Sequence, residues 1–239
     1  MITLAAIYTA LCIRELCEQG ISRLTPIPHG AVQEIRDALA PLPQWQGHVK
    51  KQGTPIGENP TATCWQQADV IRIPHLFELA LDLLSIVEGY LGEEPVLYSF
   101  NVFTTYPKEG QGQGDIQEFH TDKDDRKFVA CFLYLTDVYR EEDGAHQFQQ
   151  GTQQGKAESG SIRTMLGPAG TTFLSDTSGF HRGLRPEAAP RTVAWIRWGV
   201  GDPPSAVVWD SLTPIDKALL GDRYPTDERV QRIVRWVVR

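Results

Sequence analysis

Short runs of β-branched and aromatic residues dominate the chain from Pro95 to Val200, and they constrain the fold more than any other feature of the sequence. Such residues favour strands, because branched and ring side chains pack well on a pleated surface. The runs are separated by turns rich in Gly and Asp, and the clearest are PVLYSFNVFTTYP, RKFVACFLYLTDV, GTTFLSD and RTVAWIRWGV. This spacing of short strands predicts a β-sandwich or a small barrel.

The flanking segments predict helices packed outside this core. HLFELALDLLSIVEGYLG is typical of a helix, with Gly92 just past its end. PTDERVQRIVRWVVR places apolar residues on one side of a helix and arginines on the other. We therefore expect a single mainly β domain over residues 1–239, with a mainly helical part at 1–93, the β core at 94–209 and a helical tail at 210–239.

Composition and charge narrow the possible partners. The formal charge of −7 argues against nucleic acid, because binding to phosphates requires clustered Lys and Arg. The opening MITLAAIYTALCIRELCEQG lacks a basic start and meets Arg14 and Glu15 too early for a signal peptide or a membrane span. The four cysteines form no C-x-x-C pair, so neither a structural zinc site nor a thioredoxin-like motif is indicated, and we interpret them as small hydrophobic residues in a reducing compartment. We expect a cytoplasmic monomer or homodimer that contacts no membrane.

The segment QEFHTDKDD contains two residues, His120 and Asp122, of types that commonly bind metal ions. In a strand, residues two apart project to the same face, so His120 and Asp122 can present an imidazole and a carboxylate to one point. His181, in DTSGFHRGLRP, is the best candidate for a third ligand from another strand. Two histidines and one carboxylate on one face of an octahedron leave three positions open, which suits non-haem Fe(II).

Structural roles are the alternative for these residues. His120 alone is also consistent with a hydrogen-bonded strand histidine, and His181 with a turn residue. Arg191 favours the metal interpretation, because it lies ten residues past His181 and offers a planar, bidentate partner to a carboxylate ligand. Arg197 has the same strand parity and competes with Arg191 for this role. A surface salt bridge is the alternative for both arginines.

Residues 95–200 resemble the phytanoyl-CoA dioxygenase-like branch of the iron- and 2-oxoglutarate-dependent oxygenases. The motifs that carry the resemblance are FHTD, FLYLTDV, DGAHQFQQGTQQG and GTTFLSDTSGFHRGLRPEAAPRTVAWIRW. The family has an H-x-D motif, a Gly-containing turn, a strand before a distal His, and an Arg about ten residues beyond that His. The spacings from Gly170 to His181 and from His181 to Arg191 fit this pattern.

The resemblance implies a double-stranded β-helix core of the jelly-roll or cupin type that binds Fe(II) through His120, Asp122 and His181. It also implies 2-oxoglutarate as co-substrate, held by Arg191, and O2 as oxidant. The expected reaction is hydroxylation of a small-molecule metabolite with release of succinate and CO2. Prolyl-hydroxylase-like relatives tend to have Lys in place of Arg191. Halogenating relatives replace the carboxylate, so Asp122 argues against halogenation.

Three further polar residues are weaker candidates for binding 2-oxoglutarate: Asn101 and Tyr106 on the strand before His120, and Thr172 on a later strand. Each has a purely structural alternative. The chain also departs from the family pattern at Gln150–Gln153, where the usual Pro and His are absent. His146 stands where the family often has an apolar side chain, and we expect it to be a solvated turn residue, with a place in the substrate pocket as the alternative.

Two other functions compete with the oxygenase. The first is a non-catalytic module of the same fold that holds a metal or a small acid. The second is a hydrolase that uses the three ligands and a bound water on zinc. The oxygenase is favoured because it gives a role to the triad and to Arg191 together.

Overall fold

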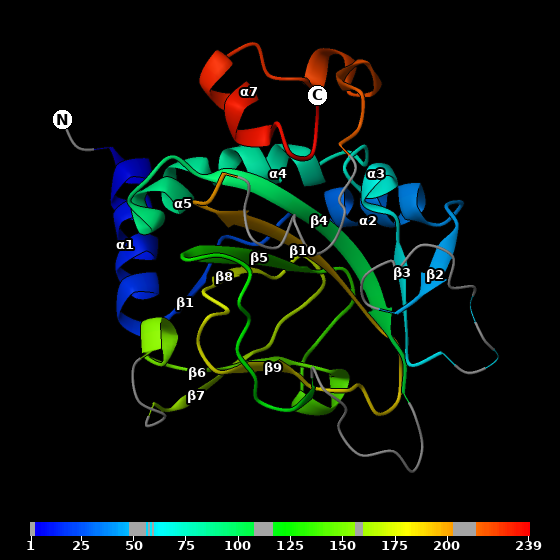
Figure 1. Ribbon diagram of the computed structural model, residues 1–239. Coiled ribbons are helices and arrows are strands. Elements are labelled where there is room, and N and C mark those ends of the chain that lie inside the picture. Colours follow the sequence, from blue (N-terminus) through cyan, green and yellow to red (C-terminus); the bar gives the residue numbers. More distant parts are fainter. Residues whose placement is uncertain are drawn as a thin grey trace.

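The computed structural model places two antiparallel β-sheets face to face, with helices on the outer side of the larger sheet (Figure 1). It describes residues 3–47, 56, 58, 60–107, 117–155, 160–202 and 214–239. The boundary expected near residue 209, between the β core and the helical tail of the single domain, lies outside these ranges.

The larger sheet has seven strands in the order β1-β8-β5-β10-β4-β3-β2, and all neighbouring strands are antiparallel. Its central strands are β4 (Val96–Thr105), β5 (Phe128–Tyr134) and β10 (Arg191–Gly199). The shorter strands are β1 (Ile21–Arg23), β2 (Gln44–Gln46), β3 (Ala62–Trp65) and β8 (Thr172–Ser175). The three central strands and β8 arise from the runs of β-branched and aromatic residues.

The smaller sheet has three strands in the order β7-β6-β9. They are β6 (His146–Gln149), β7 (Ile162–Met165) and β9 (His181–Gly183). Two short 3-10 helices flank β6, η2 (Glu141–Asp143) before it and η3 (Gln153–Gly155) after it. Figure 1 shows this sheet lying across from β5, β8 and β10.

The two faces of the larger sheet have different environments, as β10 illustrates. Trp195 points toward the smaller sheet, and its ring stacks with Phe132 of β5 at 5.8 Å between centroids. Ile196 and Trp198 alternate with it and point into the helix-covered core, where both are buried. One face therefore supplies the main hydrophobic core, and the other is available for a site between the sheets.

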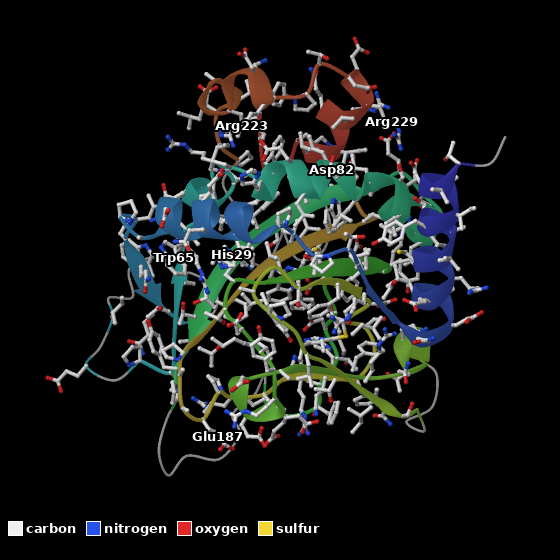
Figure 2. All side chains as sticks on the ribbon, turned by 180° about the vertical axis from the view of Figure 1, so that it is seen from behind. His29, Trp65, Asp82, Glu187, Arg223 and Arg229 are labelled. Atoms are coloured by element: carbon white, nitrogen blue, oxygen red, sulfur yellow. The ribbon has the colours of Figure 1, made fainter. Side chains whose placement is uncertain are left out.

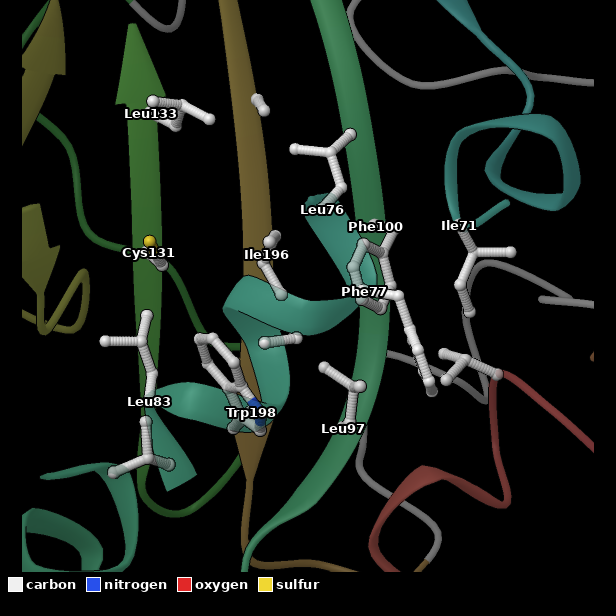
Figure 3. Packing of buried hydrophobic residues seen from close by; sticks show 14 of the residues in the cluster. Ile71, Leu76, Phe77, Leu83, Leu97, Phe100, Cys131, Leu133, Ile196 and Trp198 are labelled. Carbon is white, nitrogen blue, oxygen red and sulfur yellow. The ribbon is translucent and has the colours of Figure 1, made fainter. Parts of the chain in front are cut away.

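Helices cover the outer face of the larger sheet (Figure 1). They are α1 (Leu4–Gln19), α2 (His29–Leu39), α3 (Gln67–Val70), α4 (Leu76–Asp82) and α5 (Leu84–Leu91). Figure 3 shows Leu76 and Phe77 of α4 packing toward Phe100 and Ile196 of the sheet, and all four belong to one buried cluster. Burial of this apolar surface holds the helical layer on the sheet.

The segment HLFELALDLLSIVEGYLG, expected to form one helix, forms two. Helices α4 and α5 meet at Leu83, whose backbone ψ of −8° departs from regular helix geometry. Phe77 of α4 and Val87 of α5 are both fully buried, so both helices keep an apolar face on the sheet. Gly92 ends α5 in the left-handed conformation, with φ of 74°.

The C-terminal residues form a third layer over the helices (Figure 1). This layer contains η4 (Lys217–Leu219), η5 (Gly221–Arg223) and α7 (Glu228–Val234). It buries Ile233 and Val234 in the main core and pairs Arg229 with Glu88 of α5 (Figure 2). Among the described residues, no helix has the length and apolar character needed to cross a membrane.

We expect Leu16→Ala to lower the free energy of unfolding by about 2–5 kcal/mol. Leu16 of α1 is fully buried in the main core. Leu11 lies on the same helix but is 45% exposed, so Leu11→Ala is the matched control and should cost less than about 1 kcal/mol. Urea denaturation of both variants measures the difference. Equal losses would contradict the packing of α1 described here.

Candidate metal centre

His120, Asp122 and His181 come together between the two sheets. Their ligand atoms all lie within 4.8 Å of one another. His181 opens β9, and His120 lies beside it in an isolated antiparallel bridge. Each of the two histidines donates its backbone N–H to the carbonyl of the other at 3.0 Å. This bridge brings together residues that are far apart in the chain.

Hydrogen bonds fix the orientation of both imidazoles. His120 Nδ1 lies 2.8 Å from the Glu118 carbonyl, and His181 Nδ1 lies 3.0 Å from the Gly179 carbonyl. A carbonyl can only accept, so Nδ1 carries the proton in each ring, and Nε2 keeps its lone pair. This arrangement of a metal-binding histidine, with one nitrogen held by the protein and the other presented to the ion, recurs in metal sites.

The Asp122 carboxylate faces both Nε2 atoms. Its oxygens lie 3.9 Å from His120 Nε2 and 3.6 Å from His181 Nε2. Asp122 Oδ2 is buried and has no hydrogen-bond partner among the described residues. A buried carboxylate oxygen without a partner is costly, and a bound cation would satisfy it. The two nitrogen donors and the oxygen donor therefore fit a divalent metal ion.

Electrostatics near the triad favour a neutral His181. Burial lowers the pKa of His181, the Asp122 carboxylate acts in the opposite direction, and the neighbouring His120 lowers it further. A neutral imidazole is the form that coordinates a metal. The free ring is thus already biased toward its ligand form.

Buried hydrogen bonds shape the turn before His181. Asp176 accepts from the backbone N–H of Ser178 at 3.0 Å and from its hydroxyl at 2.5 Å, and Tyr90 of α5 donates to the second carboxylate oxygen. Burial raises the pKa of Asp176, against the lowering effect of these hydrogen bonds. Asp176 therefore fixes the backbone of the turn between β8 and β9.

The expected strand geometry of the H-x-D pair differs from the observed one. His120 makes only the isolated bridge to His181, and Asp122 belongs to no strand. Asp122 is instead held by its backbone N–H, which donates to the Thr177 carbonyl at 2.8 Å. The turn on either side of Asp176 therefore positions both His181 and Asp122.

A cavity reaches both the triad and Arg191. Its lining includes His120, His181 and Arg191, and a largely aromatic wall that contains Phe132 and Trp195. Arg191 is 4% exposed and donates to the Gly144 carbonyl at 2.6 Å and to the Thr105 hydroxyl at 3.3 Å. No acidic side chain in the described ranges pairs with it. Burial lowers the pKa of Arg191, yet a guanidinium stays protonated in proteins.

Arg197, the competing arginine, is already neutralised. It forms a buried ion pair with Asp124 and donates to the Ser99 hydroxyl at 3.0 Å. Its guanidinium also lies 4.0 Å from the centroid of the Trp195 ring. Arg191 and Arg197 lie on the same face of β10, but the structure gives them different surroundings. Among the described residues, Arg191 lines the cavity and has no carboxylate partner, whereas Arg197 is paired with Asp124.

The three weaker candidates occupy different faces. Asn101 is 6% exposed, lies opposite Trp195 in the sheet, and has an Nδ2 atom without a hydrogen-bond partner. The Tyr106 hydroxyl contacts that of Thr63 at 3.1 Å, and the Thr172 hydroxyl donates to the Gly170 carbonyl at 2.9 Å. None of the three is among the residues that line the cavity.

His146 is the residue for which the sequence interpretation was wrong. It was expected to be solvated, but it opens β6, is 4% exposed and lines the cavity. Burial, followed by the nearby His181 and Arg191, holds its pKa well below the ordinary range. Its position in place of an apolar family residue was the available signal, because such a position faces the interior.

Sequence comparisons identify no relatives of this chain. No protein-family model matches it, and no curated protein matches its sequence. The comparison of structures, in contrast, finds many similar folds.

One similar structure is the non-heme alpha-ketoglutarate-dependent epimerase SnoN from nogalamycin biosynthesis. It has a TM-score of 0.59 and 14% identity, and the match covers 80% of this chain and 83% of that chain. HygX from Streptomyces hygroscopicus, solved with nickel and 2-oxoglutarate, has a TM-score of 0.59 and 16% identity over 79% and 86% of the two chains. The carbocyclase SnoK from nogalamycin biosynthesis has a TM-score of 0.58 and 16% identity over 79% and 83%.

These similarities confirm the predicted fold class. The chain has the β-rich fold of iron- and 2-oxoglutarate-dependent enzymes, with two antiparallel sheets that form a double-stranded β-helix and helices on its outer side. They do not single out the phytanoyl-CoA dioxygenase-like branch.

We expect Asp122→Ala and His181→Ala each to weaken binding of Ni2+ or Co2+ by at least about 100-fold, since even residues outside the ligand set can be worth 10- to 100-fold. His29→Ala is the control, because His29 is exposed at the start of α2. Isothermal titration with either metal measures the affinities. Wild-type affinity in both ligand variants would show that the ion binds elsewhere.

Proposed function

We propose that this protein is an Fe(II)- and 2-oxoglutarate-dependent oxygenase that hydroxylates a small-molecule metabolite. The observation that carries the proposal is one cavity lined by His120 and His181 of the metal triad and by Arg191, which pairs with no carboxylate among the described residues. A metal site alone is consistent with several reactions. The buried Arg191 guanidinium requires in addition an anionic partner. A dicarboxylate that chelates the metal through one end can supply this partner through its other carboxylate.

The triad would hold Fe(II) through two imidazole Nε2 atoms and a carboxylate oxygen. Three ligands on one face leave room on the metal for a bidentate keto acid and for O2. When bound, iron and 2-oxoglutarate supply oxidation of the substrate by O2, with release of succinate and CO2. The protein's part is to hold the reactants in place and to limit the access of water.

Arg191 would bind the distal carboxylate of 2-oxoglutarate. A guanidinium recognises a carboxylate through two parallel hydrogen bonds, and burial strengthens this interaction. The apolar walls formed by Phe103, Phe132 and Val193 exclude water around the co-substrate. Arg197 is the less suitable partner, because Asp124 already neutralises it.

The structural neighbours support a small-molecule substrate. SnoN has been solved with Fe3+, alpha-ketoglutarate and nogalamycin RO, and HygX with nickel, 2-oxoglutarate and hygromycin B. Their names include an epimerase and a carbocyclase, so this fold serves several oxidative outcomes. We propose hydroxylation for this chain and place it in the phytanoyl-CoA dioxygenase-like branch on its motifs; the intact Asp122 disfavours halogenation.

Anaerobic titration of the Fe(II)-loaded protein with 2-oxoglutarate tests the proposal. We expect the weak visible charge-transfer band of a chelated keto acid to appear in the wild type. Arg191→Gln should weaken 2-oxoglutarate binding at least about 100-fold while leaving Fe(II) affinity unchanged, because a buried charge loses its partner. Arg140→Gln, at an exposed arginine, is the control. If iron binds without the band, the non-catalytic or zinc hydrolase alternative gains; if the band persists in Arg191→Gln, Arg191 is not the anchor.

Substitutions at Gly183 should narrow the co-substrate site by defined steps. A Cβ at Gly183 would lie 3.4 Å from Arg191 Nη1, which is an ordinary contact, so Gly183→Ala should bind 2-oxoglutarate about as well as the wild type. The added methyl groups of Gly183→Val should press on the guanidinium and weaken binding roughly 10-fold, in line with the about 1–3 kcal/mol that overpacking costs. The same anaerobic titration measures both variants. Equal affinities would place the co-substrate away from Gly183.

A further inference from the structure

His146 lines the cavity together with His120, His181 and Arg191. In the smaller sheet it pairs directly with Gly183 of β9, two residues after the metal-binding His181. Gly183 in turn lies against the Arg191 guanidinium, as the 3.4 Å separation between its Cβ position and Nη1 shows. His146 is therefore placed alongside the path from the metal triad to Arg191.

The polar side chain of His146 is not satisfied by its protein surroundings. Its ring packs against Phe132 at 4.6 Å and against Phe173 at 5.2 Å between centroids. His146 Nε2 is buried and has no hydrogen-bond partner among the described residues. A buried nitrogen without a partner is destabilising, and an apolar side chain in the same aromatic slot would avoid that cost.

The backbone holds this ring in place. The His146 N–H donates to the Tyr134 hydroxyl at 2.8 Å, and that hydroxyl donates to the Met165 carbonyl at 3.0 Å. Burial raises the pKa of Tyr134 to about 12, so it remains a neutral donor and acceptor. Strand β6 is also paired on both sides, with β7 and with β9. The imidazole is thus positioned by rigid elements.

We propose that His146 hydrogen-bonds the bound 2-oxoglutarate between the metal and Arg191, as a second anchor for the co-substrate. This inference rests on the proposed function. A carboxylate or keto oxygen of the co-substrate supplies the partner that the ring lacks. His146 thereby helps to align the keto acid with the metal, while Arg191 supplies the charge.

Metal coordination by His146 is the main alternative role for the ring. The rings of His120 and His181 have centroids 4.3 Å apart, whereas those of His146 and His181 are 5.7 Å apart. His146 is also absent from the group whose ligand atoms lie within 4.8 Å of one another. The geometry therefore favours contact with the co-substrate over contact with the ion.

Two variants of His146 separate hydrogen bonding from packing. His146→Phe keeps an aromatic ring in the slot beside Phe132 and Phe173 but removes both nitrogens. His146→Gln loses the ring but keeps a donor and an acceptor at a similar reach. We expect His146→Phe to weaken 2-oxoglutarate binding about 10- to 100-fold, the range for one hydrogen bond to a charged group, and His146→Gln to retain more of the affinity.

The measurement is the anaerobic charge-transfer titration with 2-oxoglutarate, together with Co2+ titration in its absence and a thermal melt of each variant. The reverse order, with His146→Phe binding normally and His146→Gln impaired, would assign His146 to packing and overturn the inference. A parallel loss of Co2+ affinity in His146→Phe would make it a metal ligand and also overturn the inference. Loss of binding in Arg191→Gln but not in His146→Phe refutes this inference alone, whereas absence of the band in the wild type refutes the proposed function as well.

Discussion

The candidate site depends on the pair of backbone hydrogen bonds between His120 and His181. Each bond is 3.0 Å long, and together they extend the smaller sheet by one residue beyond β9. The same two residues present their Nε2 atoms to the metal position, so the bridge sets the separation of the two nitrogen ligands. Asp122 is held near the two histidines because its backbone N–H donates to the carbonyl of Thr177, in the turn that leads into β9. Main-chain geometry thus assembles the triad before any ion binds.

The inner side of the larger sheet lies across from this bridge and forms the opposite wall of the cavity. The outer side of this sheet is covered by helices and holds the larger hydrophobic core, while its inner side carries a smaller apolar cluster around the cavity. Alternation along β10 then places Val193 and Trp195 in the cavity and Ala194 and Ile196 in the larger core. The larger core on the opposite face supplies apolar burial that does not depend on the partly polar cavity.

The sequence was sufficient to predict the fold class and a triad that the structure brings together, because period-two strands and ligand spacing are local patterns. It was not sufficient to predict the environment of a charged residue whose partner lies far away in the chain. Five consecutive charged residues such as those from Lys123 to Lys127 are typical of a solvated turn. In the structure, however, Asp124 pairs with the buried Arg197 and Asp125 accepts the backbone N–H groups of Val200 and Gly201. These partners lie more than 70 residues away in the chain, and no local pattern marks them.

Arg191 and Arg197 illustrate how pairing with a distant residue gives two arginines of one strand different environments. Both lie on one face of β10, both are 4% exposed, and sequence parity cannot separate them. Asp124 neutralises Arg197, whereas Arg191 donates to the neutral Gly144 carbonyl and Thr105 hydroxyl and pairs with no carboxylate among the described residues. Burying a charge without a counter-ion is costly, so a guanidinium in this state destabilises the free protein. An anion that entered the cavity would recover that energy on binding, which is the physical reason for proposing a co-substrate with a carboxylate away from the metal.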